Sequence, residues 1–367
     1  MKQQTSAAFE THLKDRDPNY FKGKVIYVGI DVHQKDYQVA KLCNGICLGN
    51  HRMRASASVL IEHLQKHYPG AEFSCVYESC AWGFNLQRSL TSVGMKCIVV
   101  HAADVSTTDK ERKRKTDRVD ALKLAQHLAG GELRAIHVPN ETIQQHRNLI
   151  RYRSKLVGDI NQSKNRVKSL LKYQGIEIPE PYMRNNWSRN FLEWMKQQAA
   201  VDELLADTLL LMIEQITQLR QLLLKVEAKL RSWRKGAYAA QAKLISSVPG
   251  VGPTTAMMFL LEVGDIHRFK SFDALNDFVG FCPDTNSSGQ TDRVRGLTAR
   301  RHKKLRSLLV EAAWEAIRID PVILDSFDQW SKRMKRNQAI IRVARKLLRR
   351  MRAVMIQGQP YQKGVIQ

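Results

Sequence analysis

A repeating pattern of apolar residues between positions 205 and 230 constrains the fold of this chain more than any other feature. The pattern alternates intervals of four and three residues, which aligns its members along one side of a long helix: Leu205, Leu209, Met212, Ile216, Leu219, Leu223, Val226 and Leu230. A weaker pattern of the same kind includes Arg153 and Ser163 beside Leu149, Leu156, Ile160, Val167 and Leu170. We predict a coiled-coil region over residues 142–235, whose helices pair with each other or with a second copy of the chain.

The segment before this region alternates short apolar runs with helical stretches. Strands are predicted at 25–31, 36–42, 45–52, 73–78 and 96–100, and Asn44-Gly45 is a hairpin-turn signal between the second and third. Helices are predicted at 57–67, 82–93 and 118–128. This order is that of an RNase H-like nuclease domain. We therefore assign residues 25–135 to a mixed sheet flanked by helices, preceded by an N-terminal arm of residues 1–24.

The segment after the coiled-coil region is helical and basic over residues 240–356, and a tail of residues 357–367 follows it. The predicted fold class is therefore α/β plus all-α. Residues 283–292 are rich in Gly, Ser and Asn and are predicted to form a loop.

Two glycines stand between apolar helical stretches in residues 244–265, which have the form of a helix-hairpin-helix. Gly250 and Gly252 would let a backbone phosphate approach the start of the second helix. The structural alternative is a pair of helices that only pack against each other.

The charge of the chain favours a polyanionic partner. Lys and Arg number 59 and Asp and Glu number 35, which gives a formal net charge of +24. Nucleic acid is favoured over an anionic membrane surface. The sequence contains no apolar signal segment and no long uncharged apolar run, and its six cysteines lack metal-binding spacing. We expect a cytoplasmic, nucleoid-associated protein with reduced thiols and no membrane partner.

Acidic residues follow the predicted strands of the first domain. Asp31 ends the first strand, Glu78 ends the fourth, and Asp117 and Asp120 share one face of the following helix. In an RNase H-like sheet the first and fourth strands are neighbours and the last helix crosses them, so the four carboxylates would converge. Such like charges make physical sense with bound divalent metal, such as two Mg²⁺ ions about 4 Å apart at a phosphodiester. Helix capping and turn formation are the structural alternatives.

Cations cluster beside these carboxylates and again near a serine pair. Around the acidic pair they are Lys113, Arg114, Lys115 and Arg118, which suit a phosphate backbone, although a solvated loop has the same composition. After Ser287-Ser288-Gly289 they are Arg293, Arg295, Arg300, Arg301, Lys303 and Lys304. Because these cations could bind a scissile phosphate, a serine nucleophile is chemically conceivable there, although a flexible turn has the same composition.

The ordered set GIDVHQK, YESC, KTDRVDA, SVPGVGPTTA and GFCP, followed by Ser288-Gly289, resembles the IS110 family of DEDD-type insertion-sequence transposases, relatives of the pilin-gene invertase. The resemblance covers roughly residues 25–352. It implies a RuvC-like nuclease domain, a coiled-coil middle and a C-terminal transposase domain. It also implies that Asp31, Glu78, Asp117 and Asp120 bind Mg²⁺ and that Ser288 is the nucleophile, with Ser287 as the neighbouring alternative.

The resemblance further implies DNA recombination through a covalent phosphoserine link, in a composite site shared between protomers. A structured bridge RNA would pair with donor and target DNA, and the coiled coil would assemble a dimer of dimers. Two other functions stay open from the residues alone. One is a RuvC-like structure-specific endonuclease that uses metal-activated water and no covalent serine intermediate. The other is a nucleic-acid scaffold with structural carboxylates.

Overall fold

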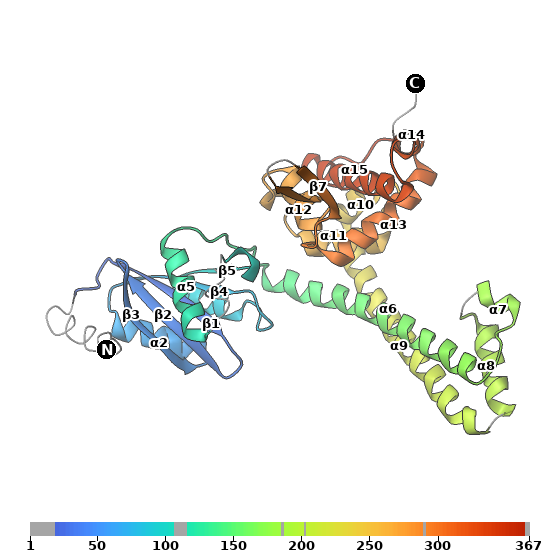
Figure 1. The fold of residues 1–367 in the computed structure, drawn as a ribbon, viewed down its shortest axis with the longest axis horizontal. Helices are drawn as coiled ribbons and strands as arrows, with labels where there is room; N and C mark the ends of the chain where they lie inside the picture. The colour runs from blue at the N-terminus through green and yellow to red at the C-terminus, as the bar shows by residue number, and fades with distance from the viewer. Residues whose placement is uncertain (1–18, 106–115, 185–186, 202, 289–290, 364–367) are drawn as a thin grey trace. The chain divides into compact units, whose positions relative to one another are not determined.

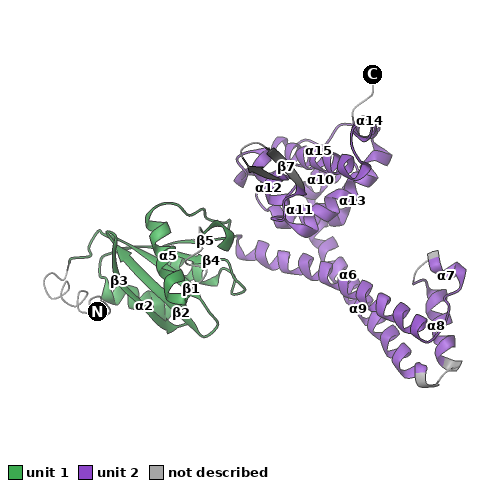
Figure 2. Ribbon diagram, viewed as in Figure 1, with its two compact units in different colours: residues 1–138 green, residues 139–367 purple. Residues whose placement is uncertain are grey.

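The structure of the chain is a computed structural model, which describes residues 19–105, 116–184, 187–201, 203–288 and 291–363. The chain divides into two compact units, residues 1–138 and residues 139–367 (Figure 2). Among the described residues, no helix is both long enough and apolar enough to cross a membrane.

The first unit is built on a five-stranded mixed sheet with strand order β3-β2-β1-β4-β5. Its strands are β1 (Val25–Val32), β2 (Asp36–Cys43), β3 (Ile46–Arg54), β4 (Glu72–Glu78) and β5 (Lys96–Val100). The pairs β1–β2 and β2–β3 are antiparallel, whereas β1–β4 and β4–β5 are parallel. The neighbouring positions of the first and fourth strands, predicted from the sequence, are confirmed.

Local sequence signals explain how the antiparallel strands and the first helix form. Asn44 and Gly45 both have positive φ, 49° and 78°, as a two-residue turn between antiparallel strands requires. The helix α2 (Ala57–His67) begins at Ser56, whose side chain accepts a hydrogen bond from the backbone N–H of Val59. The helix α3 (Asn85–Ser92) starts three residues later than the sequence predicts.

The two faces of this sheet carry separate cores. Ile26, Val28 and Ile30 of β1 pack in the same core as residues of α2 and α3. The opposite face is covered by α5 (Asp117–Ala129), whose Ala121 and Ala125 pack on β2 (Figure 1). Gly29 makes this close approach possible, because a Cβ atom there would lie 2.0 Å from the carbonyl oxygen of Ala121. The helix therefore rests directly on the backbone of β1.

Two long helices, α6 (Glu141–Tyr173) and α9 (Glu203–Lys235), pack against each other within the second unit. Near one end of the pair Val167 and Leu171 share a core with Leu205 and Leu209, and near the other end Ile150 and Leu156 share one with Val226 and Leu230. The apolar side of α9 thus packs against α6 of the same chain. In α6 the predicted positions Leu156, Ile160 and Val167 are buried. At the two ends of the pattern the buried residues are Ile150 and Leu171, one residue beyond the predicted Leu149 and Leu170.

The polar residues predicted inside the α6 pattern have polar partners on α9. Arg153 donates hydrogen bonds from Nη2 and Nε to Glu227 Oε1, over 2.7 Å and 3.1 Å. Ser163 Oγ donates to Gln215 Oε1 over 3.3 Å. These bonds satisfy polar groups that would otherwise weaken an apolar interface. Two shorter helices that the sequence did not predict separately, α7 (Glu180–Arg184) and α8 (Arg189–Val201), lie between α6 and α9 along the chain.

The remaining residues of the second unit form a mainly helical bundle around one core. Its helices are α10 (Ala239–Ser246), α11 (Pro253–Val263), α12 (Phe272–Val279), α13 (Lys303–Ile319), α14 (Pro321–Ser331) and α15 (Arg336–Gln357). The apolar side of α15 is buried through Ile340, Val343, Leu347 and Met351.

A buried acid links this bundle to α6. Glu262 of α11 is 2% exposed and receives hydrogen bonds from Nε and Nη2 of Arg151, both over 2.7 Å. His302 Nε2 lies 3.1 Å from the same carboxylate. Arg147 Nη2 donates to the Glu262 carbonyl over 3.0 Å. Burial by itself would raise the pKa of Glu262, but the bonds from His302 and Arg151 lower it to about 2.

The predicted loop over residues 283–292 is wrong, because the structure has a hairpin there. Strand β6 (Pro283–Ser288) pairs antiparallel with β7 (Thr291–Leu297), and Ser288 lies opposite Thr291. The Gly, Ser and Asn content suggested a loop, but the ladder of backbone hydrogen bonds between the two strands does not depend on those side chains. Ser288 is therefore the last residue of a strand.

Candidate metal centre

The register of the sheet sets which acidic side chains share a face. Because side chains alternate along a strand, Asp31 points to the same side as Gly29, which faces α5. Glu78 points to the same side as Val76, which packs against Leu124 of α5. Ile30 pairs with Tyr77 across the parallel strands β1 and β4, so Asp31 and Glu78 each follow a paired residue on neighbouring strands. Both carboxylates thus belong to the α5 face.

The other two predicted acids are in the first turn of α5. Thr116 caps this helix, and its side chain accepts a hydrogen bond from the backbone N–H of Val119. The cap is Thr116 and not Asp117, so the capping alternative for Asp117 is excluded and its carboxylate is available for other contacts. Asp120 lies three residues further on and interacts electrostatically with Asp31. The first turn of α5 therefore brings both acids to the end of β1.

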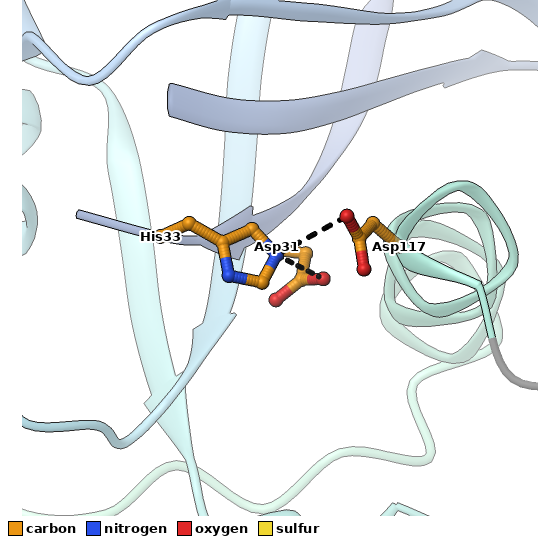
Figure 3. Close-up of side chains that lie close together, drawn as sticks. All are labelled: Asp31, His33 and Asp117. Atoms are coloured by element: carbon orange, nitrogen blue, oxygen red, sulfur yellow. Dashed lines mark hydrogen bonds and ion pairs between the residues drawn. The ribbon is translucent and has the colours of Figure 1, made fainter. Parts of the chain in front are cut away.

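His33 completes a cluster with two of these carboxylates (Figure 3). Its Nε2 atom lies 3.2 Å from Asp31 Oδ2 and 3.5 Å from Asp117 Oδ2. One ligand atom from each of Asp31, His33 and Asp117 lies within 4.8 Å of the others. The side chains are 25%, 44% and 41% exposed, which leaves the cluster open to an ion and a substrate. Two carboxylate oxygens and an imidazole nitrogen are a donor set that fits a divalent cation.

The electrostatics of the cluster favour an added positive charge. The pKa of Asp31 is raised above its ordinary value, first by burial and then by repulsion from Asp117 and Asp120, while His33 opposes the shift. A cation bound among these groups would remove the repulsion that the three carboxylates exert on one another.

Cationic side chains border the acidic cluster on the side of β3. Arg52 Nη2 lies 3.0 Å from Asp117 Oδ2, and Arg52 Nε lies 3.6 Å from Asp36 Oδ1. Arg118 is exposed, and its Nη2 atom donates a hydrogen bond to the carbonyl of Asn50 over 3.1 Å. Of the other predicted basic residues of this region, Lys113, Arg114 and Lys115 lie outside the described residues.

The remaining predicted residues belong to the second unit. Arg300, Arg301, Lys303 and Lys304 are exposed around the start of α13, and the backbones of Arg293 and Arg295 are in β7. Gly252 precedes α11 and a Cβ atom there would meet nothing within 4 Å. A Cβ atom on Gly250 would lie 2.0 Å from the carbonyl oxygen of Ala312, so helix packing accounts for that glycine. Phosphate binding by Gly250 and Gly252 stays a prediction.

Sequence reasoning missed His33 and Arg52. The signal for His33 was its spacing of two residues from Asp31 at the end of a strand, which favours one common face. Arg52 carried no local signal, because its approach to Asp117 depends on the pairing of β2 with β3 and on the position of α5.

Two protein-family models match the chain. One, described as "Transposase" of the DEDD IS110 type, matches residues 28–174, which include the four predicted acids and all of the five-stranded sheet except the first residues of β1. The other, described as "Transposase IS116/IS110/IS902 family", matches residues 242–329. The first unit is thus an RNase H-like DEDD domain, followed by a helical C-terminal region.

Curated relatives come from several bacteria. A putative transposase of Sinorhizobium fredii, y4qE, is 30% identical over 65% of this chain and 57% of its own length. The transposase for insertion sequence element IS1533 of Leptospira borgpetersenii is 24% identical over 79% of this chain and 85% of its own. The pilin gene-inverting protein of Moraxella bovis is 29% identical over 34% of this chain and 40% of its own.

Proposed function

We propose that this chain, which belongs to the IS116/IS110/IS902 transposase family, is the DNA transposase of a mobile insertion sequence and cuts and rejoins donor and target DNA. The observation that carries the proposal is the convergence of Asp31, His33 and Asp117 within 4.8 Å on the α5 face of the sheet. Asp120 and Glu78 belong to the same face. This donor set beside cationic side chains suits a phosphodiester substrate.

The carboxylates Asp31, Glu78, Asp117 and Asp120, with His33, would hold divalent metal, of which Mg²⁺ is the proposed ion. Bound metal of this kind neutralises charge on the phosphate and stabilises the leaving oxygen. The chain's own contribution is positional, because β1, β4 and the first turn of α5 fix where the carboxylates stand. Exposed Arg118, together with Lys113, Arg114 and Lys115, would bind the flanking phosphate backbone.

Ser288 is the proposed nucleophile. Its Oγ would attack a backbone phosphorus, forming an ester bond to the serine while the bond from phosphorus to one strand oxygen breaks. A strand hydroxyl would then attack the phosphoserine, restore the serine and rejoin the DNA without net use of water. The serine's place at the end of β6 and the exposed cations Arg300, Arg301, Lys303 and Lys304 support this role, because they provide charge for a phosphate.

We extend the proposal to partners and assembly. A bridge RNA would select the donor and target sites, and its binding would use the basic surfaces of the second unit. Residues 25–135, 142–235 and 240–356 would act as nuclease, coiled-coil and transposase domains. Exposed leucines on α9 support pairing with another copy, as in a dimer of dimers, because they lie outside the contact with α6: Leu210, Leu211, Leu222 and Leu224.

A second candidate function is a structure-specific endonuclease. The observation that favours it is that Asp31, His33 and Asp117 come together from residues of the first unit alone. Hydrolysis by an activated water would then need no covalent intermediate.

A trapping experiment separates these functions. The full chain is mixed with its element's flanking RNA, Mg²⁺ and a donor DNA that carries a nick beside the junction, and covalent protein–DNA adducts are resolved on denaturing gels. The transposase proposal predicts an adduct for the wild type and for Ser287→Ala, and none for Ser288→Ala. Metal-dependent cutting that is equal in wild type and Ser288→Ala, without adduct, would establish the endonuclease instead.

A further inference from the structure

A single row of side chains crosses the sheet from the acidic cluster to the edge strand. Asp31 of β1 pairs with Gln38 of β2, and Gln38 pairs with Arg52 of β3. All three point to the α5 face, as their contacts with α5 or its neighbours indicate. Because neighbouring strands lie about 4.8 Å apart, Arg52 stands about 10 Å from Asp31 along this row.

The basic end of the row opens into a hollow of about 420 Å³. Its lining consists of Gln38, His51, Arg52, Thr116, Asp117 and Arg118. The first turn of α5 also lines this hollow, with the positive end of the helix dipole, although the backbone N–H groups of Val119 and Asp120 there are already bonded to Thr116. Two guanidinium groups and a helix N-terminus thus surround one space, with Asp117 already paired to Arg52 over 3.0 Å.

The side chains around the hollow are held in place by a chain of hydrogen bonds. Gln38 Nε2 donates to Asn50 Oδ1 over 2.7 Å, and Asn50 Nδ2 donates to the carbonyl of Arg118 over 2.7 Å. Gln38 is 4% exposed, so its end of the network is shielded from water, whereas the bond between Asn50 and Arg118 is exposed. The network ties β2 and β3 to the first turn of α5, and a further bond to the Asn50 carbonyl holds the Arg118 side chain. Contacts with Asp117 and Asp36 hold Arg52.

We propose that this hollow binds a phosphodiester of the DNA strand, next to the phosphate that is cut at the carboxylates, through Arg52 and Arg118. This inference rests on the proposed function, since it assigns the acidic cluster to the scissile phosphate. Arg52 forms paired N–H···O bonds with phosphate, a geometry that a guanidinium provides and an ammonium does not. The strand therefore lies across β1, β2 and β3, with Arg52 fixing its position along the row.

The test measures binding of a fluorescent single-stranded DNA oligonucleotide to the full chain at several salt concentrations, with Ca²⁺ in place of Mg²⁺. Arg52→Gln should weaken binding roughly tenfold and lower the slope of log affinity against log salt by about 0.7, the loss of one phosphate contact. Arg52→Lys should restore the slope but only part of the affinity. The matched control is Arg88→Gln on α3, a half-buried arginine outside the hollow, which should change the affinity less than twofold.

Binding of Mn²⁺, followed by its electron paramagnetic resonance signal, separates a substrate contact from support of Asp117. The inference predicts that Arg52→Gln binds Mn²⁺ at least as well as the wild type, because Asp117 loses a competing cation. Weaker Mn²⁺ binding by Arg52→Gln, together with an unchanged slope of log DNA affinity against log salt, would overturn the inference. So would equal losses in Arg52→Gln and Arg88→Gln, or a loss seen with an RNA oligonucleotide and not with DNA.

Failure of the inference and failure of the proposed function give different results. A metal-dependent DNA product in the wild type together with an unchanged slope in Arg52→Gln removes only the inference. Absence of any such product with the flanking RNA and DNA present removes the proposed function as well.

Discussion

Two clusters in this molecule combine acidic and cationic side chains, and the pKa of the central acid shifts in opposite directions in the two. In the first unit burial raises the pKa of Asp31, and repulsion from Asp117 and Asp120 adds to the shift. In the second unit Glu262 is more deeply buried, yet its pKa is lowered to about 2 because Arg151 and His302 bond to it. The difference indicates that burial alone does not decide the charge state. The first cluster is short of positive charge, as a metal site is, whereas the second is neutralised by its own chain.

The largest effect that tests this contrast is loss of activity. Asp31→Asn and Glu78→Gln should each reduce metal-dependent DNA joining at least about a hundredfold, because each removes a proposed ligand of the metal and several kcal/mol of charge stabilisation. The assay follows joined product on sequencing gels. Glu72→Gln is the matched control, since it stands exposed at the other end of β4 and should keep wild-type activity. Activity retained by Glu78→Gln would remove that residue from the site.

The next effect is on stability. Glu262→Gln should lower the free energy of unfolding by about 3 kcal/mol, because it leaves Arg147 and Arg151 without their buried acid. Denaturant unfolding of the full chain, followed by circular dichroism, measures the change. The comparison is Glu227→Gln, whose carboxylate is 32% exposed beside Arg153 and which should cost less than about 1 kcal/mol. An equal loss of unfolding free energy in both variants would contradict the prediction that the buried carboxylate of Glu262 stabilises the fold more than the partly exposed one of Glu227.

The effect of Glu262→Gln on the free energy of unfolding should depend on pH. The pKa of Glu262 is lower in the folded chain than its ordinary 4.5, so its stabilising contribution is present above about pH 5 and is lost as the pH falls toward 2. The gap in unfolding free energy between wild type and Glu262→Gln should therefore narrow over that interval. A gap that stays constant from pH 5 to 2, by denaturant titration at each pH, would contradict the lowered pKa.

A smaller effect concerns the choice of metal. His33→Ala should weaken Zn²⁺ binding about tenfold and change Mg²⁺ binding much less, because imidazole suits zinc and carboxylates suit magnesium. Isothermal titration of each ion into the metal-free chain gives both affinities. His267→Ala, in the second unit, serves as the matched histidine control. If His33→Ala left the preference between the two ions unchanged, His33 would not be a ligand.

The smallest effect has the opposite sign to that of Glu262. In the metal-free chain Asp31→Asn should raise the unfolding free energy by about 0.5 kcal/mol, because burial first, and then repulsion from Asp117 and Asp120, destabilise the ionised carboxylate and raise its pKa. The sign follows from linkage: protonating Asp31 as the pH falls through its raised pKa adds stability. Thermal unfolding in EDTA provides the measurement. A clear loss of stability would mean that Asp31 is held by its neighbours, as Glu262 is.

The sheet of the first unit could be predicted from sequence because its signals are local. The turn at Asn44-Gly45 and the apolar alternation of β1 and β4 depend on neighbours in the chain, and the acids at strand ends follow from the same pattern. Glu262 gave no such signal, since its partner Arg151 stands 111 residues away. The hairpin of Ser288 was missed for a related reason, because strand pairing is decided between segments and not by composition.

Gly29, which lies directly beneath α5, determines how closely the acids of the helix approach Asp31. Asp117 and Asp120 ride on α5 and Asp31 on β1, and the carbonyl of Ala121 fills the volume that a methyl group on Gly29 would occupy. An alanine at position 29 would push α5 away from β1 and increase the distance between the helix and the strand. The absence of a Cβ atom at Gly29 therefore sets the spacing between Asp31 and the two acids of α5, and with it the size of the cation that these carboxylates could hold.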